Sequence, residues 1–220
     1  MNATFKSMVS AAAMLGLFSV LGMGLVKCVH QGTAARISEN QRQTLLHSLQ
    51  ALLPPGSYDN DLLADAIEIT DADLGVKPVV VYRARQTGQP VAAVFAIIAP
   101  DGYSGDIRLL IAIKSAGSLA GVRVLEHKET PGLGDLIDEN KSRWIYGFDG
   151  LSLGQPPERQ WKVKRDGGAF DQFAGASITP RAVVKAVRKS LVYFKSNQQS
   201  LFSEHVHGRM GTRLQTDGEW

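Results

Sequence analysis

The sequence predicts an α+β fold, in which an N-terminal transmembrane helix precedes a largely antiparallel sheet with helices packed on it. Three observations support this prediction: an uncharged apolar stretch near the N-terminus, four β-rich runs separated by short turns, and an amphipathic helical pattern near the C-terminus. The chain has 220 residues, of which 44% are hydrophobic and 20% are charged. This length fits one domain of ordinary size with extensions.

The first element is the stretch of residues 8–26, which contains no charged residue. A hydrophobic stretch of about 18 or more residues is long enough to cross the core of a bilayer. A cleaved signal peptide is the alternative, but it needs a shorter apolar region and a small-residue cleavage site, and Lys27 follows this stretch directly. We therefore expect residues 1–30 to form an uncleaved membrane anchor. Positive charges flank both ends of the stretch, so the positive-inside rule does not define its orientation.

A second helix is predicted to lead from the anchor into the domain. Ser38 and Gln41 form a capping-box pattern, which marks a helix N-terminus. Leucines then recur at helical spacing, and Pro54, Pro55 and Gly56 end the pattern. Residues 31–56 are therefore expected to be a lead-in helix and linker.

A set of strands follows this linker. The β-rich runs at 79–85, 91–99, 106–114 and 121–127 are predicted strands, and 66–70 is a shorter candidate. Short turns at 87–90 and 101–105 separate them, which favours an antiparallel meander. Two of the runs are almost continuously apolar, so we expect helices to cover both faces of the sheet.

The last third of the chain contains one clear helix. Thr179 and Pro180 are predicted to begin it, because proline lacks an N–H that the first turn does not use. Its buried face is marked by apolar residues at helical spacing, which are Val183, Val184, Val187, Leu191 and Phe194. Weaker patterns suggest a short helix at 135–141 and a short strand at 161–164. Residues 196–220 are expected to form a loose polar tail.

Charge and cysteine content exclude several functional classes. The net charge is only +3, and no basic stripe with interleaved aromatic residues is present, so we expect no nucleic acid partner. The basic residues after position 180 are expected to form the solvated face of the last helix. Cys28 is the single cysteine, so the chain cannot form an internal disulfide or hold an iron–sulfur cluster by itself. A redox role would therefore require an organic cofactor or a metal held by a partner.

The first segment with a candidate chemical role is EHKETPGLG, at residues 126–134. Pro131 followed by Gly132 suits a type II turn, which needs a positive φ at its third residue. The segment is either a plain strand-to-helix turn or a glycine-rich loop whose backbone approaches a flat ligand closely. A metal site made by Glu126, His127 and Glu129 is disfavoured, because adjacent residues on a strand point to opposite faces.

The second segment is DQFAGASITP, at residues 171–180, where two hydroxyl residues stand at a predicted helix N-terminus. Ser177 or Thr179 could simply cap the helix by accepting a hydrogen bond from a free N–H group. Alternatively, one hydroxyl could carry a phosphate ester, because the free N–H groups and the positive dipole end of a helix favour an anion there.

Together, LAGVRVLEHKETPGLGDLI and DQFAGASITP resemble the FMN-binding domain of the G subunit of the Rnf electron-transport complex. That family is related to the C subunit of the sodium-pumping NADH:quinone reductase. In it, a D-x-x-[ST]-G-A-[TS] motif receives FMN through a phosphoester, which a flavin transferase installs from FAD. Four residues match this motif in order and spacing, and residues 129–134 match the E-T-P-G-L-G run that lies against the flavin in the family.

The resemblance implies covalent FMN on Ser177, with Thr179 as the helix cap. It implies a cofactor-binding set consisting of Asp171, Gly175, Ala176, Ser177 and Thr179 in the second segment and Glu129, Thr130, Pro131, Gly132, Leu133 and Gly134 in the first. The sequence departs from the family pattern at Ala174, where Ser or Thr is usual, and at Ser177, where Thr is usual. Serine offers the same hydroxyl nucleophile, so the attachment chemistry remains available.

The resemblance extends to about residue 195 and implies an FMN-binding domain over residues 57–195. The implied function is an electron relay within a membrane-bound electron-transport complex, with other subunits as partners and a flavin transferase during maturation. The implied location is the bacterial inner membrane, with a single span and the globular part on the periplasmic side. A quinone-reductase C subunit and a non-redox membrane scaffold that has lost the flavin are the rival functions. No nucleophile–base–orienter set is recognisable, so a stand-alone enzyme is disfavoured.

Overall fold

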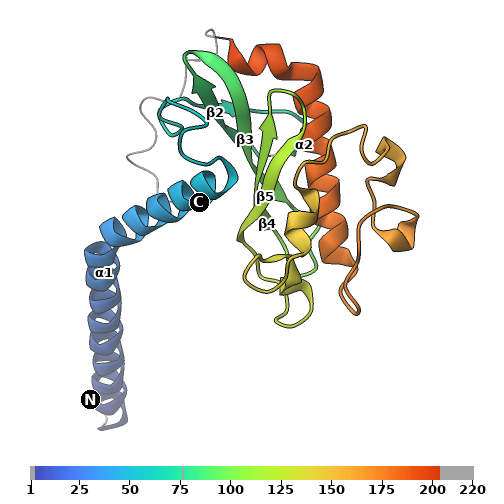
Figure 1. Cartoon of the computed structure of the whole chain (residues 1–220). Coiled ribbons are helices and arrows are strands. Elements are labelled where there is room, and N and C mark those ends of the chain that lie inside the picture. The colour runs from blue at the N-terminus through green and yellow to red at the C-terminus, as the bar shows by residue number, and fades with distance from the viewer. Residues whose placement is uncertain (1–2, 76, 204–220) are drawn as a thin grey trace. The chain divides into compact units, whose positions relative to one another are not determined.

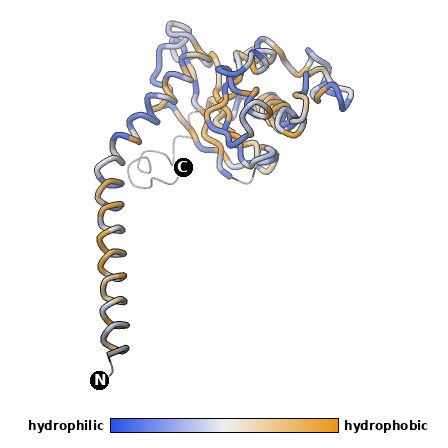
Figure 2. Tube along the Cα trace, turned by 90° about the horizontal axis from the view of Figure 1, so that it is seen from below, coloured by the Kyte–Doolittle hydropathy of each residue, from blue (hydrophilic) through white to orange (hydrophobic). Residues whose placement is uncertain are grey.

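The computed structural model describes residues 3–75 and 77–203, which fall into two compact units that divide between Leu45 and Leu46. The first element, α1 (Ala3–Leu52), is a single helix of 50 residues. Figure 2 shows hydrophobic residues along much of its N-terminal part, where large apolar side chains such as Leu15, Phe18 and Leu25 are exposed. By length and composition this helix could cross a membrane.

The prediction that a separate helix begins at Ser38 is wrong, because α1 continues through this position. A capping box acts only where the preceding residues leave the helix, and Gly32 is the only glycine or proline between residues 27 and 37. The backbone hydrogen bonds of α1 therefore continue, and the anchor and the lead-in segment share one helix. The predicted end is confirmed: α1 stops at Leu52, just before Pro54.

The sheet is a five-stranded antiparallel meander in the order β1-β2-β3-β4-β5, as predicted (Figure 1). Its strands are β1 (Ala66–Ile69), β2 (Val79–Gln86), β3 (Gln89–Ala99), β4 (Ile107–Lys114) and β5 (Leu119–Glu126). The turn between β2 and β3 is shorter than predicted. It consists of Thr87 and Gly88 alone, whose φ values of 50° and 77° fit a two-residue type I′ hairpin.

Both faces of the sheet are buried, as the apolar runs predicted. The last helix, α2 (Ile178–Phe202), lies along one face (Figure 1), where Phe95 of β3 contacts Phe194 edge to face with a centroid separation of 6.3 Å. On β5, Leu52 packs against Gly121: a Cβ added to Gly121 would lie 3.0 Å from Leu52 Cδ2. All five residues predicted for the buried face of α2 are buried, from Val183 to Phe194.

The segment between β5 and α2 has little regular structure. The helix predicted at 135–141 is only a single 3-10 turn, η1 (Gly134–Ile137). The strand predicted at 161–164 is wrong, because this stretch hydrogen-bonds to its own neighbours: Lys164 N donates to Phe170 O at 2.7 Å, and Phe170 N donates to Lys162 O at 3.2 Å. An aromatic cluster fills this region instead, and it consists of Trp144, Phe148, Trp161, Phe170 and Phe173.

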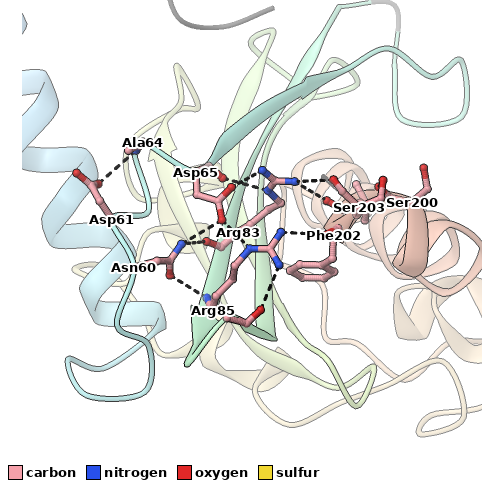
Figure 3. Close-up of polar contacts among 11 residues, drawn as sticks. Asn60, Asp61, Ala64, Asp65, Arg83, Arg85, Ser200, Phe202 and Ser203 are labelled. Atoms are coloured by element: carbon pink, nitrogen blue, oxygen red, sulfur yellow. Dashed lines mark hydrogen bonds and ion pairs between the residues drawn. The ribbon is translucent and has the colours of Figure 1, made fainter. Parts of the chain in front are cut away.

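The helix α2 continues past residue 195, where the predicted domain ends, and its last residues Leu201 and Phe202 are buried. The tail prediction is therefore wrong for residues 196–203, and residues 204–220 lie outside the described residues. The physical reason lies on β2. Figure 3 shows Arg83 and Arg85 reaching between Asp65 and the last turn of α2, where Arg83 Nη1 donates to Leu201 O at 3.2 Å and Arg85 Nη2 donates to Phe202 O at 3.0 Å.

Candidate functional site

The acceptor loop, residues 171–177, connects the aromatic cluster to α2. At its start, Trp144 Nε1 donates a hydrogen bond to Asp171 O at 2.9 Å. In its middle, Ala176 N donates to Phe173 O at 3.2 Å across a turn in which Gly175 has a φ of 78°. The glycine takes a backbone conformation that other residues adopt only at a penalty. The loop is thus fixed at both points before the chain enters α2.

Ser177 is the N-cap residue of α2, and its side chain makes no capping hydrogen bond. The residue is half-buried, with φ −72° and ψ −17°. A serine at this position ordinarily accepts a hydrogen bond from an N–H group of the first turn. Because the hydroxyl of Ser177 is not used in this way, it remains available for chemistry.

The prediction that Thr179 caps α2 is wrong. The helix begins at Ile178, so Thr179 is its second residue and Pro180 its third. Proline is still tolerated there, since the first N–H groups of a helix have no intrahelical partner. Thr179 is fully buried, and its Oγ1 donates to Glu129 Oε2 at 2.5 Å rather than to a backbone acceptor.

The glycine loop, residues 129–134, is the turn that the sequence predicted. Leu133 N and Gly134 N both donate to Thr130 O at 3.1 Å, and Gly132 has a φ of 77°. All four residues from Thr130 to Leu133 are exposed, while Glu129 and Gly134 are buried. Leu133 is 42% exposed, so this loop presents a large apolar side chain to solvent.

The two loops meet. A Cβ added to Gly175 would lie 3.5 Å from Leu133 Cδ2, so the exposed leucine lies beside the acceptor loop. The hydrogen bond between Thr179 and Glu129 joins the same two segments from the buried side. Asp171, by contrast, lies at the outer end of its loop, where its exposed carboxylate pairs with Lys164 Nζ at 2.5 Å.

Sequence reasoning missed two residues near this junction. Trp144 holds the start of the acceptor loop through its hydrogen bond to Asp171 O. The sequence around Trp144 has no clear helical or strand periodicity, so nothing there indicated this role. Asp135, directly after the glycine loop, is 6% exposed, and its Oδ1 is buried without a hydrogen-bond partner among the described residues. A buried carboxylate oxygen without a donor is rare in folded proteins and points to a donor from a bound molecule or water.

Basic residues of α2 form ion pairs with carboxylates of neighbouring segments. Arg181, in the first turn of α2, binds Asp166 through two hydrogen bonds of 2.5 and 2.8 Å. The hydrogen bond from Arg181 holds the pKa of the Asp166 carboxyl below its ordinary value. Two further pairs, Lys185 with Asp101 and Arg188 with Glu158, continue along the same helix. The solvated basic face predicted for α2 therefore also carries ion pairs to three loops.

The residues at the junction fit a flat ligand that carries a phosphate. Leu133 offers an apolar surface, Gly132 has no atom within 4 Å of its Cβ position, and Ser177 offers a hydroxyl at a helix N-terminus. Two surface hollows of about 460 and 410 Å³ are lined by other residues, so neither contains this junction. Among the described residues, no group of three or more His, Cys, Asp or Glu side chains could hold a metal ion.

Comparisons with known proteins identify the family of this chain. Residues 102–192, which include both loops, match the family model of an FMN-binding domain, and residues 1–52 match the RnfG N-terminal region. The chain is 52% identical over 203 residues to the G subunit of the ion-translocating oxidoreductase complex of Pseudomonas aeruginosa (strain UCBPP-PA14), covering 91% of this chain and 95% of the relative. It is 48% identical to the corresponding protein of Shewanella loihica, covering 90% and 94%, and 44% identical to that of Vibrio cholerae (strain O395), covering 86% and 91%.

Proposed function

We propose that this chain, which belongs to the family of G subunits of ion-translocating oxidoreductase complexes and contains an FMN-binding domain, is a membrane-anchored flavoprotein component of such a complex. In this proposal it relays electrons through FMN, which is held covalently by a phosphoester to Ser177, and it forms no product of its own.

The observation that carries the proposal is the state of the Ser177 side chain. Its hydroxyl stands at the N-terminus of a 25-residue helix, yet it makes no capping hydrogen bond. The N–H groups at such an end, together with the positive end of the helix dipole, stabilise an adjacent anion. A phosphodiester on Ser177 carries about one negative charge, so it would occupy an environment that favours it.

The attachment follows from ordinary phosphoryl transfer. Ser177 Oγ attacks the phosphorus of FAD that bears the ribityl oxygen, and the new Oγ–P bond replaces the P–O bond of the pyrophosphate. AMP leaves, and the hydroxyl proton passes to a base of the flavin transferase. The half-buried position of Ser177 between an exposed Ala174 and an exposed Ile178 supports access by a second protein.

The other residues of the site would hold and cover the cofactor. Leu133 supplies an apolar contact, Gly132 lets the backbone approach a ring closely, and Asp135 Oδ1 offers an acceptor to a donor group of the ligand. Bound FMN supplies the reversible uptake and release of electrons. A covalent bond would retain the cofactor while leaving its ring open to redox partners.

We further propose that α1 anchors the protein in the bacterial inner membrane with a single span. The uncharged, exposed apolar part of this helix supports the anchor. In this proposal α1 is a signal anchor with a short cytoplasmic end, so the globular part lies on the periplasmic side. The partners in this proposal are the other subunits of the complex and, during maturation, the flavin transferase.

The test uses the full chain co-expressed with a flavin transferase. On a denaturing gel viewed under ultraviolet light, the wild-type chain should fluoresce, and Ser177→Ala should be folded but dark. Because the Ser177 side chain makes no capping bond, we expect Ser177→Ala to change stability by less than about 0.5 kcal/mol.

Two further variants complete this test. Ser177→Thr should retain the flavin, and Ser196→Ala, near the C-terminal end of α2, serves as the control. Covalent FMN that persists in Ser177→Ala, or that peptide mass mapping locates on another residue, would refute the assignment. A wild-type chain without any flavin would favour the scaffold that has lost its cofactor.

A further inference from the structure

Two buried polar side chains from distant segments contact each other behind the site. Glu129, in the glycine loop, is 5% exposed, and Thr179, in the first turn of α2, is 0% exposed. Thr179 Oγ1 donates a hydrogen bond of 2.5 Å to Glu129 Oε2, across a separation of 50 residues in sequence. Hydrogen bonds in which one partner is charged are roughly twice as strong as neutral ones. This pair is therefore a strong link between the two loops.

The carboxylate of Glu129 is itself held in place. Its second oxygen, Oε1, accepts a hydrogen bond of 3.0 Å from Ser104 N, in the turn between β3 and β4. Two glycines allow the close packing around it: a Cβ added to Gly134 would lie 2.7 Å from Glu129 Oε2, and one added to Gly102 would lie 2.9 Å from Oε1. The side chain therefore joins three segments and has no room to shift.

The position of this link determines what it can control. Thr179 lies two residues after Ser177, on the first turn of the helix that Ser177 precedes. The opposite end of the link is Glu129, which begins the loop that carries Leu133. The link therefore defines how the acceptor hydroxyl faces the exposed leucine, which lies beside Gly175.

We propose that Glu129 and Thr179 are positioning residues for flavin attachment, which rests on the proposed role of Ser177 as the acceptor. In this proposal the two side chains act from behind the site, because both are buried and bonded to each other. Their role is to hold the N-terminus of α2 against the glycine loop, so that Ser177 and the flavin-facing surface are presented in one fixed arrangement.

The test compares the rate of covalent loading in variants that differ in this link alone. Full-length chains, produced without transferase and purified in detergent, are mixed with purified flavin transferase and FAD at a temperature well below unfolding. Thr179→Val keeps the shape of the side chain and removes the donor, so the loading rate should fall at least about tenfold. Thr179→Ser restores the hydroxyl and should stay within about threefold of wild type. Glu129→Gln should resemble Thr179→Val, and the double variant should be no slower than the slower single variant, because residues that act as a unit are not additive.

The matched control is Ser190→Ala. Ser190 is 0% exposed on the same helix, and its Oγ donates to Ala186 O at 2.9 Å, so this change also removes a buried hydroxyl but lies far from the site. Even if Ser190→Ala lowers thermal stability as much as Thr179→Val does, or more, it should acquire covalent flavin at the wild-type rate. Thr179→Val loading as fast as Ser190→Ala would overturn the proposal. If Thr179→Val does not fold, Glu129→Gln against the same control decides the question.

The two proposals fail in different ways. If Ser177→Ala still acquires covalent flavin, the acceptor assignment is wrong, whatever the link variants do. If Ser177→Ala stays dark while Thr179→Val and Glu129→Gln load normally, the acceptor assignment holds and only the positioning role is wrong.

Discussion

Replacing Arg83 by methionine tests what holds the end of α2. Arg83 is 1% exposed. Its guanidinium donates to Leu201 O at 3.2 Å, to Ser203 O at 3.4 Å and to the backbone and carboxylate of Asp65. Arg83→Met keeps an unbranched stem in the core and removes the cation with all of these donors. The change therefore leaves the last turn of α2 without its main polar contact to β2.

The size of the effect follows from which groups lose their partners. Removing one member of a buried ion pair typically costs about 3–5 kcal/mol, because the other member is left uncompensated. Here Asp65 keeps Arg85, whose Nε lies 2.8 Å from Oδ2, and Asp65 is itself 15% exposed. The lower end of that range is therefore expected, a loss of about 3 kcal/mol. For a chain of this length, that loss corresponds to a decrease in Tm of about 6–12 °C.

Thermal unfolding and hydrogen exchange of the full chain measure this prediction together. Tm should fall as stated, and the backbone amides of the last turn of α2 should exchange faster in Arg83→Met than in wild type. Arg85→Met is the matched control: its side chain is 18% exposed and contacts the same carboxylate and the same helix end. It should lose less than about half as much stability. An Arg83→Met chain within about 1 kcal/mol of wild type, or with unchanged exchange in that turn, would refute the reasoning.

Three further predictions concern pH, the glycine loop and the acceptor loop. Burial raises the pKa of Tyr82 from 10.0 to about 12, so the unfolded chain loses this proton first and stability falls between pH 10 and 12. In urea titrations at alkaline pH, the unfolding free energy of Tyr82→Phe should therefore decrease by about 2–3 kcal/mol less over this range than that of the wild type. Gly134→Ala should destabilise the chain by about 2–4 kcal/mol in urea unfolding, because its Cβ would lie 2.7–3.0 Å from the buried hydrogen-bonded pair behind the site. At Gly132 an added Cβ meets no atom within 4 Å, but the φ of 77° strains any other residue. Gly132→Ala should therefore lower the unfolding free energy by only about 1–2 kcal/mol. Equal losses for the two variants would contradict the role given to crowding at Gly134. Trp144→Phe removes the hydrogen bond to Asp171 O, so limited proteolysis should cut the acceptor loop faster than in wild type, and an unchanged rate would show that the loop does not depend on it.

The parts of the fold that the sequence predicted are those that depend on neighbours in the chain. β-rich runs separated by short turns specify a meander, because each strand pairs with the next one along the sequence. The glycine loop was equally predictable, since a Pro-Gly pair favours a type II turn, in which the glycine has the positive φ that Gly132 adopts. Both motifs lie within residues 102–192, which match the family model of an FMN-binding domain.

The parts that sequence reasoning missed depend on contacts between distant residues. The role of Thr179 is determined by Glu129, 50 residues earlier, and a local capping pattern cannot reveal this. The end of α2 is determined by Arg83, 118 residues from Leu201, so a polar stretch that looked like a tail continues as helix. Local propensity describes what a segment can form, and tertiary contacts decide where it starts and ends.

The two ends of α2 show how these distant contacts serve one purpose. A helix carries a partial positive charge at its N-terminus and a partial negative charge at its C-terminus. The buried carboxylate of Glu129 is bonded to the first turn, and the guanidinium groups of Arg83 and Arg85 are bonded to carbonyl oxygens of the last turn and its C-cap. Each end thus meets a charge of the stabilising sign. At the N-terminus, Glu129 is bonded through the Thr179 hydroxyl and through Ser104 N, not through the first N–H groups of α2. The first N–H groups of a helix have no partner within the helix, so in the proposed function a phosphate on Ser177 would lie beside those of α2 and be stabilised by them.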